Sequence, residues 1–266
     1  MTDEMLKKIK QLPPLPESAM QIEAVYQDPD SSFNDMVKIL EKDPLLTADI
    51  LKAANSPLYG FSREINAISQ AVGLFGMGTV RGFALASIVK KSFTLDLSPY
   101  GIDEEVFSSL SKKQHGLMTA WCLKKENKLL GILSPAAFLV EIGKVLISQQ
   151  IIANESKEAF KKSLGEFDSV EEAEREILGV DTPEVSAIVF KHWRFEEGLV
   201  NTIANCENPE EAQPQYQRAA KILHVVRTTV PMNGIITDES VEAAKVLIKE
   251  YDLDMESFDK ALENAR

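Results

Sequence analysis

Apolar residues recur at steps of three and four positions along most of the chain, and no sustained run alternates at every second position. Steps of three and four place residues on one face of an α-helix, whereas a half-buried strand alternates with period two. The pattern therefore predicts an all-α fold without strands.

The first part of the chain predicts a series of helices separated by proline and glycine. Asp43 followed by Pro44 is typical of a helix N-cap and its first helical residue, and Ser31 or Ser32 can cap the helix before it. The expected helices run over 17–27, from Phe33 to Leu40, from Pro44 to a stop at Pro57, from a Ser69 cap to Phe75, and over 79–93, with 76–78 as a tight link between the last two.

Ser98, Pro99, Tyr100 and Gly101 interrupt the helical pattern. We expect a boundary here, with an N-terminal helical subdomain over 1–97 and a second helical subdomain over 98–266. Helices of the second part are expected near 103–126, 134–153, 155–164, 169–178, 183–192, 196–206, 214–228, 238–251 and 256–265.

The composition of the chain bears on its core and on its possible partners. A hydrophobic content of 44% is enough to bury an ordinary core. The net charge is −12, and residues 98–266 hold most of it, with 29 acidic and 19 basic side chains against 12 and 10 in residues 1–97. Nucleic-acid binders usually present a basic face, so this balance makes nucleic acid an unlikely partner.

The start of the chain and its cysteines bear on location. Residues 1–10 alternate charged and apolar side chains, so they lack both the apolar core of a signal peptide and the length of a membrane span. Cys122 and Cys206 lie far apart and outside any CxxC spacing, which fits a reducing compartment. We expect a soluble, cytoplasmic protein with no membrane partner.

Metal chemistry has few possible ligands in this chain. His115, His192 and His224 are its three histidines, and none has the HxxxH or HExxH spacing. A catalytic zinc needs about three protein ligands, so any site would have to recruit carboxylates. His115 with Glu141 is the candidate pair, although a polar contact that satisfies a buried histidine is the favoured interpretation.

The remaining candidates have simple interpretations. His192 fits a solvated histidine at a helix end, and His224 fits a core histidine that donates to a backbone carbonyl. No histidine lies near Cys206 in the sequence, which favours an idle thiol over a nucleophile. The glycines at 76–78 follow no strand, so they do not predict a phosphate loop. The two helices around this link could be taken for a DNA-binding motif, but Arg81 alone gives its second helix too little positive charge.

Four segments stand in a particular order and spacing: 12–16 (LPPLP), 43–47 (DPLLT), 54–60 (ANSPLYG) and 65–76. Together they resemble the HDOD family, bacterial signalling proteins related to the HD and HD-GYP metal phosphohydrolases. The resemblance extends over about residues 12–206. It implies an all-helical protein in which an N-terminal bundle packs on a degenerate HD-type helical half.

Within this resemblance, His115 aligns with the first histidine of the HD pattern, and Val140 and Glu141 stand at its defining His-Asp pair. Valine has no lone pair to give a metal. Asn205 and Cys206 stand where a pair of histidines often lies.

Two later positions also depart from the family pattern. Thr182 follows Asp181 where the family would have a histidine, and Arg227 stands where a helix would end in a ligand aspartate. A cation at that position repels a divalent metal. The resemblance therefore implies a vestigial pocket without metal or cofactor, formed by His115, Glu141, Lys144, Thr182 and Arg227.

The corner over 55–60 is the other candidate site. Asn55, Ser56 and Tyr59 can form a signature surface, because an irregular corner displays polar groups that a helix hides. Alternatively, Asn55 and Ser56 close the helix end and Tyr59 packs inward.

These observations predict a regulatory or signal-transduction module that is not an enzyme and that binds an unidentified signalling protein or a small ligand. The first alternative is a residual metal-dependent phosphohydrolase with a rebuilt site of His115, Glu141 and a carboxylate such as Asp181. The second is a helical nucleic-acid binder.

The predicted core and the predicted lack of a metal also suggest how alanine substitutions change the stability of the protein. Substituting Ile50 or Leu51 by alanine is expected to cost about 2–5 kcal/mol if the residue is buried. Glu141→Ala is expected to cost far less if Glu141 no longer anchors a metal.

Overall fold

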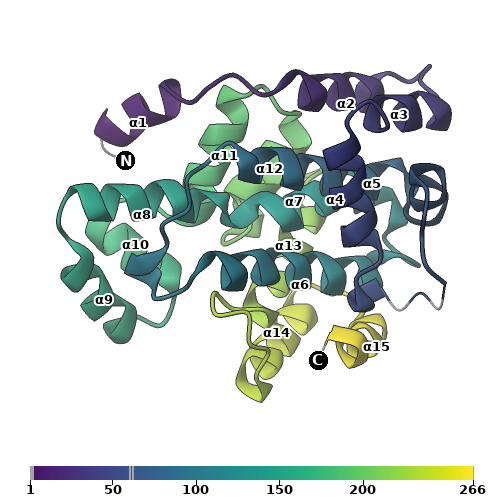
Figure 1. The fold of residues 1–266 in the computed structure, drawn as a ribbon. Helices are drawn as coiled ribbons and strands as arrows, with labels where there is room; N and C mark the ends of the chain where they lie inside the picture. The colour runs from purple at the N-terminus through teal and green to yellow at the C-terminus, as the bar shows by residue number, and fades with distance from the viewer. Residues whose placement is uncertain (1–2, 60, 62, 266) are drawn as a thin grey trace.

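The computed structural model describes residues 3–59, 61 and 63–265, and these residues form helices and connecting turns with no strand among them (Figure 1). The prediction of an all-α fold is confirmed. Gly60, at the end of the predicted corner, lies outside the described residues.

The N-terminal helices begin and end close to where the sequence predicts. Asp43 caps its helix by accepting hydrogen bonds from the backbone amides of Leu45 and Leu46, and Ser32 forms a capping box with Asp35. These helices are α1 (Asp3–Lys10), α2 (Glu17–Gln27), α3 (Phe33–Leu40), α4 (Pro44–Ala54) and α5 (Ile68–Lys91).

Three details of this part differ from the predictions. Ser69 is not a cap, because Ala67 is the N-cap residue of α5. The two helices predicted around Gly76 form one element with a kink, where Gly76 has the positive φ of 79° that glycine adopts at little cost. Helix α1 was not predicted, and Met5 and Ile9 bury its apolar face.

The second part continues from a turn at 98–100, after which Gly101 adopts a left-handed conformation. Its helices are α6 (Glu104–Cys122), α7 (Leu130–Leu139), α8 (Gly143–Ala153), α9 (Lys157–Glu166), α10 (Val170–Leu178), α11 (Thr182–His192), α12 (Glu197–Ala204), α13 (Gln217–Thr229), α14 (Asp238–Glu250) and α15 (Met255–Ala265).

The single helix predicted over 134–153 is divided by a 3₁₀ turn, Val140–Ile142. The hydroxyl of Ser186, on α11, donates to the carbonyl of Val140 at 2.6 Å and accepts from the amide of Gly143 at 2.8 Å. A side chain that inserts into a helical ladder interrupts it. The prediction of one helix was wrong because Ser186 lies 46 residues from Val140, beyond the reach of a local pattern.

The two parts of the chain share one hydrophobic core. Helix α5 packs along α7, α7 packs on α6, and α1 reaches α11 (Figure 1). Buried apolar residues from Met5 to Leu262 belong to one cluster. The division at residue 97 therefore crosses a continuous core, and two separate subdomains stay a prediction.

Two segments are long and apolar enough to span a membrane by length and composition, Ile68–Lys91 and Asn127–Ala153. Of their most apolar windows, 61% and 83% are buried inside the protein. Both segments serve as core helices of this fold.

Candidate functional site

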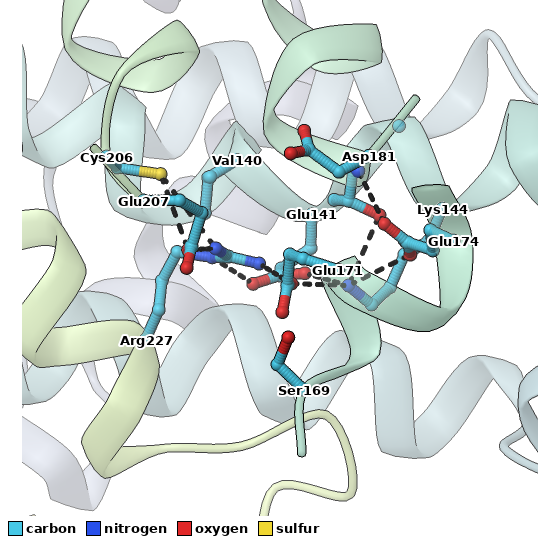
Figure 2. A network of polar contacts seen from close by, with 12 residues as sticks. Val140, Glu141, Lys144, Ser169, Glu171, Glu174, Asp181, Cys206, Glu207 and Arg227 are labelled. Atoms are coloured by element: carbon cyan, nitrogen blue, oxygen red, sulfur yellow. Dashed lines mark hydrogen bonds and ion pairs between the residues drawn. The ribbon is translucent and has the colours of Figure 1, made fainter. Parts of the chain in front are cut away.

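Six charged side chains gather around the 3₁₀ turn at 140–142, and we call them the charge cluster (Figure 2). They come from the 3₁₀ turn itself, from the start of α8, from α10, from α13 and from the turn after α12. The charge cluster consists of Glu141, Lys144, Glu171, Glu174, Glu207 and Arg227.

Arg227 lies at the centre of one half of the charge cluster, with 8% of its surface exposed. Its Nε lies 2.9 Å from Glu141 Oε1, and one terminal nitrogen lies 2.5 Å from Glu171 Oε1. The other terminal nitrogen pairs with Glu207. The planar guanidinium thus bridges three carboxylates from different segments.

Lys144 lies in the other half and is 1% exposed. Its Nζ is 2.8 Å from Glu141 Oε2, 3.7 Å from Glu174 Oε1 and 3.8 Å from Glu171 Oε1. Nζ also donates to the hydroxyl of Thr182 at 3.3 Å. Glu141 is therefore held between two cations, Arg227 on one oxygen and Lys144 on the other.

Glu174 is completely buried and receives three hydrogen bonds. The backbone amide and the hydroxyl of Thr182 each donate to it at 2.6 Å, and the hydroxyl of Tyr100 donates at 2.7 Å. Asp181, next to Thr182, does not join the charge cluster, because it caps α11 and pairs with Arg175.

Charge does not balance within the charge cluster, since four carboxyl groups face two cations. Burial alone would raise the pKa of Glu141, but Arg227 and Lys144 hold it well below its ordinary value. Burial raises the pKa of Glu174 to about 7, and the nearby Glu171 adds to this effect against the pull of Lys144. Glu174 is thus the carboxyl group that keeps a proton most readily.

The residues at this place do not fit a metal ion. Val140 is completely buried and offers no donor, and both oxygens of Glu141 already face protein cations. The positive charges of Lys144 and Arg227 would repel a divalent cation. Over the described ranges, no group of three or more histidine, cysteine or carboxylate residues is placed to hold one.

His115 lies apart from the charge cluster, although the sequence placed it in the same pocket. Its Nδ1 is 2.5 Å from the hydroxyl of Tyr59, its Nε2 is 2.8 Å from Ser134 Oγ, and its ring stacks on Phe138. The neighbouring Gln114 is the residue that reaches Glu141, at 3.0 Å. Successive residues of a helix point in different directions, so α6 turns His115 toward the N-terminal bundle.

Burial lowers the pKa of His115 to about 3, so its ring is neutral at pH 7. With its contacts given by Tyr59, Ser134 and Phe138, His115 is a satisfied core histidine. His115 therefore has the kind of polar contacts that the sequence favoured for it, and they come from Tyr59 and Ser134 rather than from Glu141.

Residues of the signature surface have different roles. Asn55 closes the end of α4 by donating to the carbonyl of Leu51. Its side-chain amide also donates to the carbonyl of Ile65 and accepts from the amide of Ile65, at 2.8 Å each. Tyr59 turns inward and packs edge-on against Phe75 and other aromatic rings. Asn55 and Ser56 border a cleft, so the corner still presents polar groups to an open space.

The structure also places Cys206, His192 and His224. Burial raises the pKa of Cys206 to about 12. His192 is exposed at the end of α11, as expected from the sequence. His224 is half-buried and its ring contacts the hydroxyl of Tyr251 at 2.8 Å, so the predicted bond to a backbone carbonyl is replaced by a side-chain contact.

Sequence reasoning missed Glu171, Glu174 and Glu207. Glu171 and Glu174 are three residues apart on α10, a spacing that places them on one helix face. Glu172 and Glu176 of the same helix are exposed and look alike in the sequence. Only the position of α10 against Lys144 and Arg227 separates the two kinds of glutamate.

Comparison with known proteins gives a family match over most of the chain. The model of the HDOD domain matches residues 12–209, close to the 12–206 expected from the sequence. Among curated proteins, an uncharacterized protein of Treponema pallidum (strain Nichols) is 31% identical over 70 residues. That match covers 26% of this chain and only 14% of the relative.

Solved structures share the helical fold along nearly the whole chain. A protein of Shewanella amazonensis SB2B named "Putative phosphohydrolase" superposes with a TM-score of 0.74 at 23% identity, covering 99% of this chain and 94% of that one. A virulence factor of Campylobacter jejuni subsp. jejuni gives 0.59 at 28% identity, with coverage of 99% and 100%.

A third solved structure, named "Putative signal transduction protein", comes from Marinobacter aquaeolei VT8. It superposes with a TM-score of 0.73 at 20% identity, covering 100% of this chain and 60% of that one. These likenesses confirm the predicted HD-type helical fold.

Proposed function

The chain belongs to the HDOD family, and from this premise we propose that it is a cytoplasmic regulatory module that works by binding a signalling protein or a small ligand. In this proposal the protein does not hydrolyse phosphate esters.

The occupied charge cluster is the observation that carries this proposal. A metal phosphohydrolase needs carboxylates and histidines that are free to coordinate a cation and an open position for water. In this chain Lys144 and Arg227 stand between the carboxylates, at 2.8 Å and 2.9 Å from Glu141. In this proposal, protein cations take the positions beside Glu141 that metal ions would need.

The rebuilt phosphohydrolase remains the alternative, and its geometry is unfavourable. It needs His115, Glu141 and Asp181 around one ion, but His115 contacts Tyr59 and Ser134. Asp181 is committed to its helix cap and to Arg175. Nothing in these contacts aims the three side chains at one point.

Binding to nucleic acid is also unsupported at its suggested site. Arg81 is completely buried, where it pairs with Glu23 at 2.6 Å and Glu196 at 2.8 Å. A buried, paired arginine cannot reach a phosphate backbone.

For the regulatory role, one of the fold neighbours is named a signal transduction protein. The cytoplasmic assignment is supported by Cys122 and Cys206, which are both buried and free of disulfides.

The test combines metal analysis with a hydrolysis assay. Protein purified from cells grown with added manganese, iron and zinc is expected to contain far less than one transition metal per chain, and to leave bis-p-nitrophenyl phosphate intact with each metal added. Glu141→Gln, which keeps the shape of the side chain, and His192→Ala, an exposed control, are assayed beside it. Metal-dependent turnover that Glu141→Gln abolishes and His192→Ala preserves would disprove the proposal.

A further inference from the structure

A cleft of about 970 Å³ opens between the two parts of the chain, and the described residues that line it include none of the charge cluster. One wall comes from the end of α4, a second from the last turns of α5, and a third from the first half of α6. Phe138, Leu139 and Ile142, at the end of α7 and in the 3₁₀ turn, form its floor. This size lies within the range typical of small-molecule sites.

The rim of the cleft is basic, although the protein as a whole is acidic. Four lysines and two carboxylates line it, which leaves an excess of two positive charges in a chain of net charge −12. A cleft lined by one sign of charge concentrates the field and attracts ions of the opposite sign. The lining charges are Lys52, Lys90, Lys91 and Lys112 against Asp49 and Glu104.

Both carboxylates form ion pairs with lysines of the cleft. Asp49 pairs with Lys91 at 2.8 Å and accepts from the hydroxyl of Ser87 at 2.6 Å. Glu104 pairs with Lys90 at 3.1 Å. The excess charge therefore belongs to the other two lysines, Lys52 on α4 and Lys112 on α6.

Lys52 and Lys112 stand on different walls of the cleft, and within the described part of the chain neither has a carboxylate within ion-pair distance. Burial, Lys90 and Lys52 together lower the pKa of Lys112. The lysines are thus close enough to repel one another. An anion between them would relieve this repulsion, because ammonium groups are common partners of phosphate.

The cleft is also lined by aromatic and apolar side chains, which contrast with its charged residues. Phe83, Phe93 and Phe107 line it together with the apolar floor, while the hydroxyls of Ser56, Ser108 and Ser111 lie among the polar lining. A ligand that suits this surface combines a charged group with an apolar or aromatic body.

We propose that this cleft binds a small phosphorylated molecule with an aromatic body, of about mononucleotide size, with its phosphate between Lys52 and Lys112. The proposal rests on the proposed function, because it specifies the small ligand that a binding module would take. An acidic peptide is the competing occupant, but it would leave the apolar and aromatic lining of the cleft without an apolar partner.

The probe is mant-AMP, a fluorescent mononucleotide, with mant-adenosine as its uncharged counterpart. Binding to the purified full chain is followed by fluorescence anisotropy at low and high salt. Wild-type protein is expected to bind mant-AMP at least about tenfold more tightly than mant-adenosine, a preference that weakens as salt screens the lysines. Inorganic pyrophosphate is expected to compete.

Two double variants locate the site. Lys52→Gln with Lys112→Gln is expected to weaken mant-AMP binding by about tenfold or more, since it removes both unpaired charges. Lys124→Gln with Lys128→Gln removes the same charge from exposed positions outside the cleft and is expected to leave binding within about twofold. Ser108→Phe, which fills the cleft without changing its charge, is expected to abolish binding.

The proposal is overturned if wild-type protein binds neither mant-AMP nor pyrophosphate at about 1 mM, or if the two double variants lose binding equally. Tighter binding of a hexaglutamate peptide than of mant-AMP would also overturn it, in favour of an acidic peptide. Release of phosphate from AMP by the wild-type protein would instead contradict the proposed function, so the two failures are distinguishable.

Discussion

Among single residues, Glu141 shows most clearly that the role of a side chain depends on its surroundings in the fold. Its position in the sequence suggests a leftover of a lost metal site. In the structure it is 3% exposed and forms ion pairs with both Lys144 and Arg227. Its removal would take one carboxylate from two buried cations, so the structure favours a larger cost for Glu141→Ala than the sequence predicted.

We predict that Glu141→Ala destabilises the protein by about 3–5 kcal/mol, the range for breaking a buried ion pair. Ile50→Ala, at a fully buried apolar position, is expected to cost about 2–5 kcal/mol and serves as the reference. Urea denaturation followed by circular dichroism measures both. A cost for Glu141→Ala below about 1 kcal/mol would show that the two cations do not depend on it.

Glu174 adds a pH dependence at the same scale. Burial raises its pKa to about 7 in the folded protein, against an ordinary value of 4.5. The folded state thus binds a proton that the unfolded state releases between these values, so the contribution of Glu174 to stability falls as pH rises from 4.5 through 7. His115, with its pKa lowered from 6.5 to about 3, acts in the opposite direction as pH falls below 6.5.

Because Glu174 and His115 both change the stability of the protein over the same pH range, we predict the stability of the wild type relative to a variant that lacks only the effect of Glu174. Glu174→Gln has no proton to gain, so the stability of the wild type relative to Glu174→Gln is expected to rise as pH falls from about 8 to about 5. Thermal unfolding of both proteins across this range measures it. Glu172→Gln, an exposed substitution on the same helix, is the control. Parallel curves for the wild type and Glu174→Gln would refute the pKa assignment.

At the scale of elements, the division between α7 and α8 places the charge cluster. The 3₁₀ turn at 140–142 turns Glu141 and Lys144 toward α10 and α13, and the hydroxyl of Ser186 maintains the interruption. Close approach of α8 to α11 depends on Gly143. A β-carbon there would lie 2.3 Å from the carbonyl oxygen of Thr182 and 2.8 Å from Ser186 Oγ.

We predict that Gly143→Ala destabilises the protein by about 1–3 kcal/mol, because the added methyl forces the backbone of α11 away. Gly165→Ala is the matched control, since a β-carbon at Gly165 in α9 meets nothing within 4 Å. That change is expected to stabilise by about 0.5–1 kcal/mol. Thermal unfolding compares the two, and equal effects would mean that α8 and α11 are not closely packed at Gly143.

For the whole molecule, the N-terminal bundle and the HD-type half are joined by polar as well as apolar contacts. Arg81 of α5 pairs with Glu23 of α2 and Glu196 before α12, and it donates to the carbonyl of Gly131 on α7. His115 and Tyr59 make a second link between the parts. The cleft lies along the same junction, so a ligand bound there would contact both parts at once.

Local information was sufficient for much of the fold. Helical periodicity located most helices, and the caps at Ser32 and Asp43 were readable because their partners lie within three residues. The valine at position 140 was also directly readable, and no environment gives valine a lone pair for a metal. These features depend on residue type and short-range spacing, which the sequence states directly.

Tertiary structure decided what the charged residues do. Ser186 interrupts a helix from 46 positions away, Arg227 meets Glu141 across 86, and Tyr59 meets His115 across 56. The direction of a helical side chain and the distance to its partner depend on how helices pack, and packing follows from the whole core. For this reason the sequence alone predicted a site poor in metal ligands, but only the fold showed that Lys144 and Arg227 pair with its carboxylates.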